Sequence, residues 1–127
     1  MLPNIKNGID WAALLLRIVG GAFMLTHGVP KLMKIINGDF SFGNPIGIGE
    51  ELSLILTVFA EFVCALLVLI GFKTRWASIP LIITMMVAAF IVHGSDPFGD
   101  KEMALIYLII YVCIYSIGPG KYSVDKS

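Results

Sequence analysis

Four apolar runs, each close to the length of a bilayer-crossing helix, constrain this chain more than any other feature of its sequence. A helix that crosses the hydrocarbon core needs about 20 mostly apolar residues, because it rises about 1.5 Å per residue. The last two runs are short enough to need a thin bilayer or part of their flanks. The runs cover residues 11–30, 52–72, 76–93 and 102–118. The sequence therefore predicts an all-α fold, a membrane-spanning four-helix bundle, as a single domain over residues 1–127.

Composition favours lipid over water as the solvent of this bundle. The chain is 57% hydrophobic and 14% charged, whereas about a quarter of the residues of a soluble domain are charged. A soluble domain of this size leaves about a third of its unfolded-chain surface in water, so it could not hide so much apolar surface. Nine basic and nine acidic residues balance, and the absence of a basic block excludes nucleic acid as an expected partner.

The flanks of the runs predict the topology. The first run ends in LTHGVPK, not in a small-residue cleavage site, so we expect a retained helix and not a removed signal peptide. KTR at 73–75 forces a hairpin, and GSDPFGDK at 94–101 is a turn-forming cluster. In the longer link between the first two runs, LMKII is either an amphipathic helix at the interface or part of an ordinary loop.

Loop charges predict the orientation. Five basic residues lie on one side and three on the other, which by the positive-inside rule places both termini in the cytoplasm. The five are Lys6, Lys73, Arg75, Lys121 and Lys126, and the three are Lys31, Lys34 and Lys101.

Arg17 and Glu61 are the charged residues well inside the predicted spans. Arg17 lies roughly 9 Å in from Trp11, and Glu61 roughly 13 Å in from the opposite face, near the midplane. Charges at such depth are costly, face the bundle interior and pair with one another. We therefore expect Arg17 and Glu61 to meet, either as a functional site or as a buried ion pair that fixes helix register.

A second polar layer is expected above Glu61. His27 and His93 lie near the outer ends of the first and third spans, Glu102 begins the fourth, and Lys31 follows His27 by one helical turn. These four groups could converge on one outward-facing site, where a histidine beside carboxylates can shuttle protons. The alternative is that they cap helix ends among the lipid headgroups.

Sulfur and aromatic side chains offer weaker candidates. Cys64 and Cys113 fall at similar depth and are a candidate redox pair, although buried cysteine as a small hydrophobe is commoner. Neither belongs to a CxxC or zinc-ligand spacing, so no metal site is expected. Tyr107, Tyr111 and Tyr115 form a stripe at four-residue spacing, which favours helix packing, with the lining of a quinone-like ring as the minor alternative.

Taken in order, several segments resemble the DoxX family of small bacterial membrane proteins. They are LLLRIVGGAFMLTHGVPKL, AEFVCALLVLIGFKTRWA, ITMMVAAFIVH, EMALIYLIIY and GPGKYSVD. The resemblance implies a four-helix, multi-pass protein of the bacterial inner membrane. It also maps the family's polar positions onto Arg17, His27, Lys31, Glu61, Arg75, His93, Glu102 and Asp125.

The resemblance also implies a redox setting, because the family is named for a membrane subunit linked to quinone-reducing sulfur oxidation. Other members are associated with thiol redox and oxidative-stress enzymes. This chain has no heme-ligand motif and no CxxC. We therefore expect no cofactor of its own, a quinone as the candidate ligand and a redox-enzyme partner to supply the electrons.

Three functions stay open on the sequence alone. The first is a subunit of, or accessory to, a quinone- or thiol-linked membrane oxidoreductase that uses the buried Arg/Glu/His cluster. The second is a small-molecule binder or transporter, which with four helices would need a homo-oligomer to form a path. The third is a non-catalytic anchor or assembly factor whose buried charges only hold the helices together.

Overall fold

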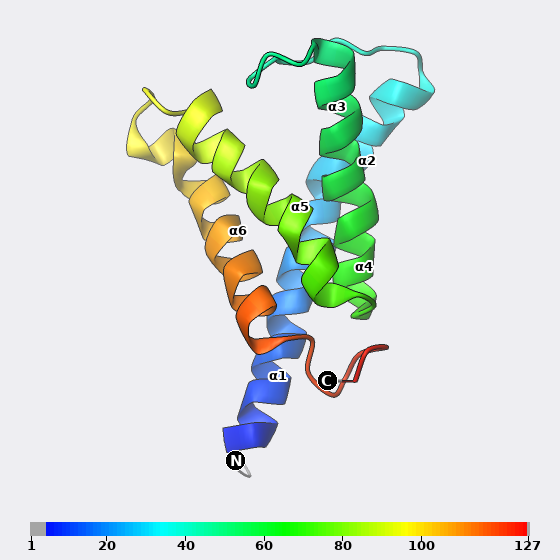
Figure 1. Cartoon of the computed structure of the whole chain (residues 1–127), viewed down its shortest axis with the longest axis vertical. Helices are drawn as coiled ribbons and strands as arrows, with labels where there is room; N and C mark the ends of the chain where they lie inside the picture. Colours follow the sequence, from blue (N-terminus) through cyan, green and yellow to red (C-terminus); the bar gives the residue numbers. More distant parts are fainter. Residues whose placement is uncertain (1–4, 127) are drawn as a thin grey trace.

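The computed structural model describes residues 5–126, which form helices joined by loops, with no strand anywhere in that range (Figure 1). Short π-helical segments, labelled η, continue the α-helices, so the described residues make four helical rods. The rods are α1 (Ile5–Ile18), η1 (Val19–Phe23) and α2 (Met24–Ile36); α3 (Glu50–Val58), η2 (Phe59–Cys64) and α4 (Ala65–Ile70); α5 (Thr74–Val87) and η3 (Ala88–Val92); and α6 (Phe98–Ile117). The all-α prediction is confirmed for this part of the chain.

Among the described residues, three rods are long and apolar enough to cross a membrane: residues 7–36, 50–70 and 74–92. The fourth, α6, has 20 residues, but Asp100, Lys101 and Glu102 lie in its first turns. The first rod runs well past the predicted end at residue 30, because α2 continues through LMKII to Ile36. The ordinary-loop alternative for LMKII is therefore wrong.

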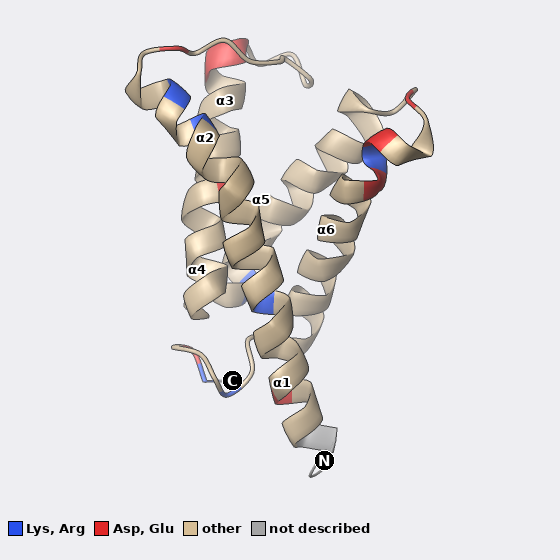
Figure 2. Ribbon diagram, turned by 180° about the vertical axis from the view of Figure 1, so that it is seen from behind, with Lys and Arg blue, Asp and Glu red and all other residues tan. Residues whose placement is uncertain are grey.

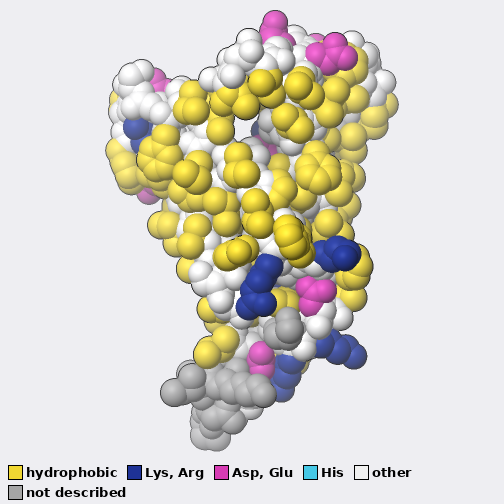
Figure 3. All heavy atoms as spheres, in the orientation of Figure 1, with side chains coloured by type: hydrophobic (Ala, Val, Ile, Leu, Met, Phe, Trp, Pro, Cys, Tyr) yellow, Lys and Arg dark blue, Asp and Glu magenta, His cyan; other side chains and the backbone are white. Residues whose placement is uncertain are grey.

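The rods cross near the α4–α5 turn and splay apart toward the 37–49 and 93–97 loops (Figure 1). Acidic and basic residues gather toward the two ends and leave the middle of the ribbon nearly bare (Figure 2). The face of the molecule seen in Figure 3 is largely hydrophobic along the rods. Exposed apolar side chains on the rods include Leu15, Phe90 and Ile109, each more than half exposed. Such a surface needs lipid, not water, around it.

The core lies where the rods cross and is built from small and medium side chains. Small residues let neighbouring helices approach closely, which is how helices pack in membranes. The buried cluster consists of Met24, Ala60, Cys64, Ala65, Val68, Ala77, Leu81, Met85, Tyr107, Tyr111 and Ile114.

Arg17 closes the end of the bundle at the α4–α5 turn and does not pair with Glu61. Its buried guanidinium donates hydrogen bonds to four carbonyl oxygens, at distances of 2.8 to 3.2 Å. The acceptors are Val68 and Leu69 at the end of α4, and Pro119 and Tyr122 in the chain that follows α6. The last carbonyls of a helix lack a partner within it, so the predicted Arg17–Glu61 pair is wrong because these acceptors hold Arg17 at its own depth.

The carboxylate of Asp125 caps the other side of the same turn. It accepts hydrogen bonds from the backbone N–H groups of Lys73 and Thr74, each at 2.9 Å, and from the Thr74 hydroxyl at 2.8 Å. These N–H groups begin α5, where a helix has unpaired donors and a positive dipole end. The chain after α6 thus fastens the hairpin between the second and third rods.

Candidate functional site

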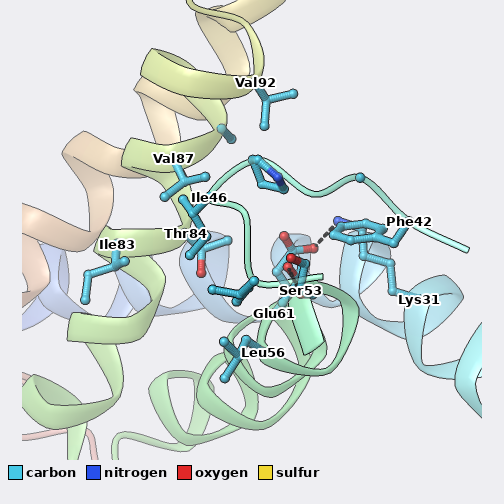
Figure 4. A pocket seen from close by; sticks show the side chains of 15 residues that line it. Lys31, Phe42, Ile46, Ser53, Leu56, Glu61, Ile83, Thr84, Val87 and Val92 are labelled. Atoms are coloured by element: carbon cyan, nitrogen blue, oxygen red, sulfur yellow. Dashed lines mark hydrogen bonds and ion pairs between the residues drawn. The ribbon is translucent and has the colours of Figure 1, made fainter. Parts of the chain in front are cut away.

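Glu61 is buried in η2, with 4% of its surface exposed, and pairs with Lys31. The Lys31 ammonium donates to Oε1 of Glu61 at 2.6 Å (Figure 4). A π-helical turn widens the helix and turns side chains away from their usual register, and such turns are frequent at functional sites. The buried carboxylate is therefore neutralised by Lys31, one turn after His27 in the first rod, and not by Arg17 as predicted.

Gly28 brings α2 close enough for this pair to form. A Cβ atom added at Gly28 would lie 2.2 Å from the carbonyl oxygen of Glu61, a distance that no real side chain tolerates. The missing side chain lets the α2 backbone rest directly on η2. Lys31, one helical turn further along α2, then reaches the carboxylate. The sequence signal for this partner is a glycine three residues before a lysine, and the depth of a charge along its helix does not reveal it.

An apolar cavity of about 360 Å³ lies on one side of the ion pair. Glu61 and Ser53 lie at its floor, α5 forms the facing wall, and the 37–49 loop crosses above (Figure 4). Its lining residues are Lys31, Phe42, Gly43, Pro45, Ile46, Ile48, Ser53, Leu56, Thr57, Glu61, Ile83, Thr84, Val87, Ala88 and Val92. Pockets of this size with apolar walls and a few polar groups are typical of small-molecule sites.

Ser53 adds an unpaired polar atom to that cavity. The residue is 5% exposed, and its Oγ is buried without a hydrogen-bond partner among the described residues. Leaving a buried hydroxyl unpaired costs about 1–3 kcal/mol, so buried hydroxyls are nearly always bonded. The Ser53 hydroxyl is therefore suited to bond a polar atom of a molecule in the cavity. Sequence reasoning missed this residue because one serine in an apolar run carries no signal.

A second cavity of about 190 Å³, here called the vestibule, lies on the other side of the ion pair. It shares Lys31, Glu61 and Ala88 with the apolar cavity. Its full lining is Met24, His27, Lys31, Glu61, Met85, Ala88, His93, Asp100, Met103, Ala104 and Tyr107. The structure thus brings four predicted site residues together around one small space: His27, Lys31, Glu61 and His93.

Glu102 and Arg17 line neither of these two cavities. On α6, Asp100, Met103, Ala104 and Tyr107 follow the spacing of one helix face, and that face forms the vestibule wall. Glu102 falls off that face and is exposed. Asp100 therefore supplies the acidic group that was predicted from Glu102.

A column of rings leads from the vestibule into the core. The His27 and Tyr107 rings meet edge to face with centroids 5.8 Å apart, and Tyr107 stacks on Tyr111 at 6.1 Å. The Tyr111 hydroxyl donates to the carbonyl oxygen of Gly20 in η1 at 2.8 Å. Tyr115, in contrast, is 46% exposed, so the stripe divides into two packed rings and one outward ring.

The cysteines lie apart from both cavities. Cys64 is buried in the core cluster, Cys113 is partly exposed, and both are free thiols. Within residues 5–126, no group of three or more His, Cys, Asp or Glu side chains is placed to hold a metal ion.

Comparison with known proteins adds the following findings. A family model described as DoxX matches residues 12–94 of the chain, a stretch that includes Ser53, Lys31 and Glu61. The chain is also similar to an uncharacterized protein of Haemophilus influenzae, with 24% identity over 136 residues that cover 98% of this chain and 96% of that protein. No solved structure matches the chain.

Proposed function

The chain belongs to the DoxX family, and from that premise we propose that it is a membrane subunit that binds the ring of a quinone in the apolar cavity for a partner oxidoreductase. The observation that carries the proposal is the unpaired Ser53 hydroxyl beside the Lys31–Glu61 pair, in an otherwise apolar space of about 360 Å³. The ring of a quinone is apolar on its faces and carries carbonyl oxygens at its edge.

The residues present fit such a ring. The Ser53 hydroxyl and the Lys31 ammonium are two donors for its carbonyl oxygens, and hydrogen bonds from a charged group are the stronger kind. Leu56, Ile83 and Val87 offer apolar contact to its faces. A hydrophobic tail could leave the cavity over exposed apolar side chains toward lipid.

The chemistry divides between the ligand, the partner and this chain. A bound quinone supplies the capacity to take up two electrons, here from the partner oxidoreductase, together with two protons. Lys31 orients the ring by donating to an oxygen, and Glu61 holds or yields a proton at its carboxylate. The apolar walls keep water away from the ring faces, which strengthens the hydrogen bonds made inside.

The proposal includes a topology: four membrane-spanning helices in the bacterial inner membrane, with both termini in the cytoplasm. The positive-inside asymmetry of the loops and the 20-residue length of α6 support it. In a cysteine-free background, a membrane-impermeant thiol reagent added to intact cells should label Ser95→Cys and leave Lys73→Cys unlabelled. The reverse pattern would overturn the orientation.

Binding of a short-chain quinone to the purified protein in lipid nanodiscs tests the function. Ser53→Ala removes one hydrogen bond of about 0.5–1.5 kcal/mol, so affinity should fall roughly 2- to 10-fold. Thr84→Trp fills the cavity from the α5 wall and should abolish binding. Ile109→Trp adds the same bulk to the exposed face of α6 and should leave binding unchanged. Equal binding by all four proteins would show that the quinone does not occupy this cavity.

A further inference from the structure

We propose that the vestibule is the route by which Glu61 exchanges protons with water, so that the Lys31–Glu61 pair separates a proton-exchange compartment from a ligand compartment. The ligand side of this inference rests on the proposed function, while the proton route stands on the vestibule itself. The claim is therefore that two cavities with different chemistry serve one carboxylate.

The ion pair forms part of the wall between the two cavities. Both cavities are lined by Lys31, Glu61 and Ala88, and no other residue appears in both linings. Ala88 begins η3, and its small side chain leaves the pair as the main polar feature of the shared wall. A proton that reaches Glu61 from one cavity is thus available on the other side without crossing the apolar space.

The two linings differ sharply in ionisable groups. Apart from the pair itself, none of the described residues that line the apolar cavity is ionisable, because α3 and α5 contribute only hydroxyl and apolar groups to it. The vestibule adds four ionisable groups: His27 from α2, His93 after η3, and Asp100 and Tyr107 from α6. Histidine changes its charge between about pH 5 and pH 8 and is the usual proton carrier in that range.

The vestibule also opens toward the splayed end of the bundle. His27 and Asp100 are exposed, and Met103 is 57% exposed. The His93 ring is held by its Nδ1 atom, which lies 2.9 Å from Oδ2 of the exposed Asp96. Groups that can carry protons therefore lie between the surface and Glu61.

The exchange is a simple proton transfer. One proton enters from water through the vestibule and converts the Glu61 carboxylate to a carboxylic acid, while Lys31 remains a cation. The ammonium then no longer faces an opposite charge at 2.6 Å and is free to donate to an oxygen in the apolar cavity. Loss of the proton to either cavity restores the ion pair.

Infrared difference spectra of quinone-free protein in nanodiscs test the route. A carboxylic-acid band that vanishes in Glu61→Gln reports the protonation of this residue, and we expect it to appear after a downward jump in pH. Ala104→Trp, which fills the vestibule, should slow its appearance at least severalfold. Thr84→Trp, which fills the apolar cavity, should not. No Glu61 band in folded protein, or slowing by Thr84→Trp alone, would overturn the proposal.

Water access gives a second test that does not need the bulky variants. In a background without Cys64 and Cys113, a membrane-impermeant thiol reagent should label Ala104→Cys in the vestibule and not Thr84→Cys in the apolar cavity. An unlabelled Ala104→Cys would contradict the route. Because neither measurement includes a quinone, a protein that passes both and binds no quinone refutes the proposed function and leaves the proton route standing.

Discussion

At the scale of single residues, the two buried charges of this chain have different roles. Among the described residues, the side chain of Arg17 donates its hydrogen bonds to backbone carbonyl oxygens at the closed end of the bundle. Glu61 bonds to Lys31, and the pair stands in the wall between two cavities. The depth of a charge along its helix did not distinguish these roles. The partner of each charge depends on which groups pack against it, which are backbone carbonyls for Arg17 and the Lys31 ammonium for Glu61.

The Lys31–Glu61 pair should behave differently when one or both partners are removed. Lys31→Met alone leaves a buried carboxylate without a counter-charge and should destabilise the protein by about 3–5 kcal/mol. Lys31→Met combined with Glu61→Met should recover most of this loss, because the buried charge is then gone. Denaturant unfolding in detergent measures both values.

Quinone binding by the double variant separates a functional pair from a structural one. On the present account the double variant is folded and binds no quinone. Full binding by the stable double variant would show that the pair only holds α2 against η2.

Arg17→Lys should lower stability without affecting the site. A lysine ammonium cannot reach four carbonyls arranged around a planar guanidinium, and each carbonyl left unpaired costs about 1–3 kcal/mol. Thermal unfolding in detergent should show the loss, while the folded fraction keeps its affinity for quinone. Wild-type stability, or weakened binding in folded Arg17→Lys, would contradict the separation of the two charges.

At the scale of elements, the close approach of α2 and η2 decides whether the site exists. The four rods and the approximate ends of the last three could be predicted from apolar run length, whereas the first rod extends past both of its predicted ends. The convergence of His27, His93, Lys31 and Glu61 could be predicted from a rise of about 1.5 Å per residue. The direction in which each side chain points could not, because the π-helical turns η1, η2 and η3 change the register within otherwise regular helices.

Contacts between distant segments could not be predicted from the sequence either. The 37–49 loop crosses the apolar cavity, and residues 119–125 return to the α4–α5 turn. Neither segment has a periodic pattern that would place it. The unpaired hydroxyl of Ser53 indicates a ligand site only together with the cavity beside it, and the sequence does not show that cavity.

Gly28→Ala tests the close approach of these elements. The added methyl group meets the Glu61 backbone, so the helices must move apart at a cost of about 1–3 kcal/mol. Lys31 then moves away from the carboxylate, and we expect weaker quinone binding as well. Gly8→Ala is the matched control, because a Cβ there has nothing within 4 Å. Equal stability of the two variants in denaturant unfolding would contradict the tight contact.

Asp125 makes the α4–α5 hairpin sensitive to acid. Although partial burial acts to raise the pKa of Asp125, hydrogen bonds from the Thr74 and Lys73 N–H groups and the Thr74 hydroxyl hold that pKa below its ordinary value. The stabilisation is therefore fully present above the unfolded-state pKa of about 3.9, and it is lost as the pH falls through the lower folded-state value.

Asp125→Ala should thus cost about 0.5–2 kcal/mol of unfolding free energy at neutral pH, the usual cost of removing a helix cap. The gap between wild type and variant should close as the pH falls below about 4. Thermal unfolding in detergent across that range measures it. A gap that stayed constant down to the lowest pH would show that the charge of Asp125 plays no part.

At the scale of the whole molecule, the two ends of the bundle have separate tasks. Around the α4–α5 turn, Arg17 and Asp125 bind the helix termini together through hydrogen bonds. Toward the opposite end the rods splay (Figure 1), and both cavities lie between them with the Lys31–Glu61 pair at their boundary. An end held by hydrogen bonds, with two cavities between the rods at the other end, is an arrangement suited to ligand binding.

The central claim is that a quinone ring binds between Ser53, Lys31 and Glu61. The most direct test is photolabelling of the protein in nanodiscs with a quinone that carries a light-activated group on its ring, followed by mapping of the labelled peptides. We expect label within residues 53–61 or 83–92, suppressed by unlabelled quinone and absent in Thr84→Trp. Label on the outward face of α6 around Ile109, or label that unlabelled quinone does not suppress, would contradict it.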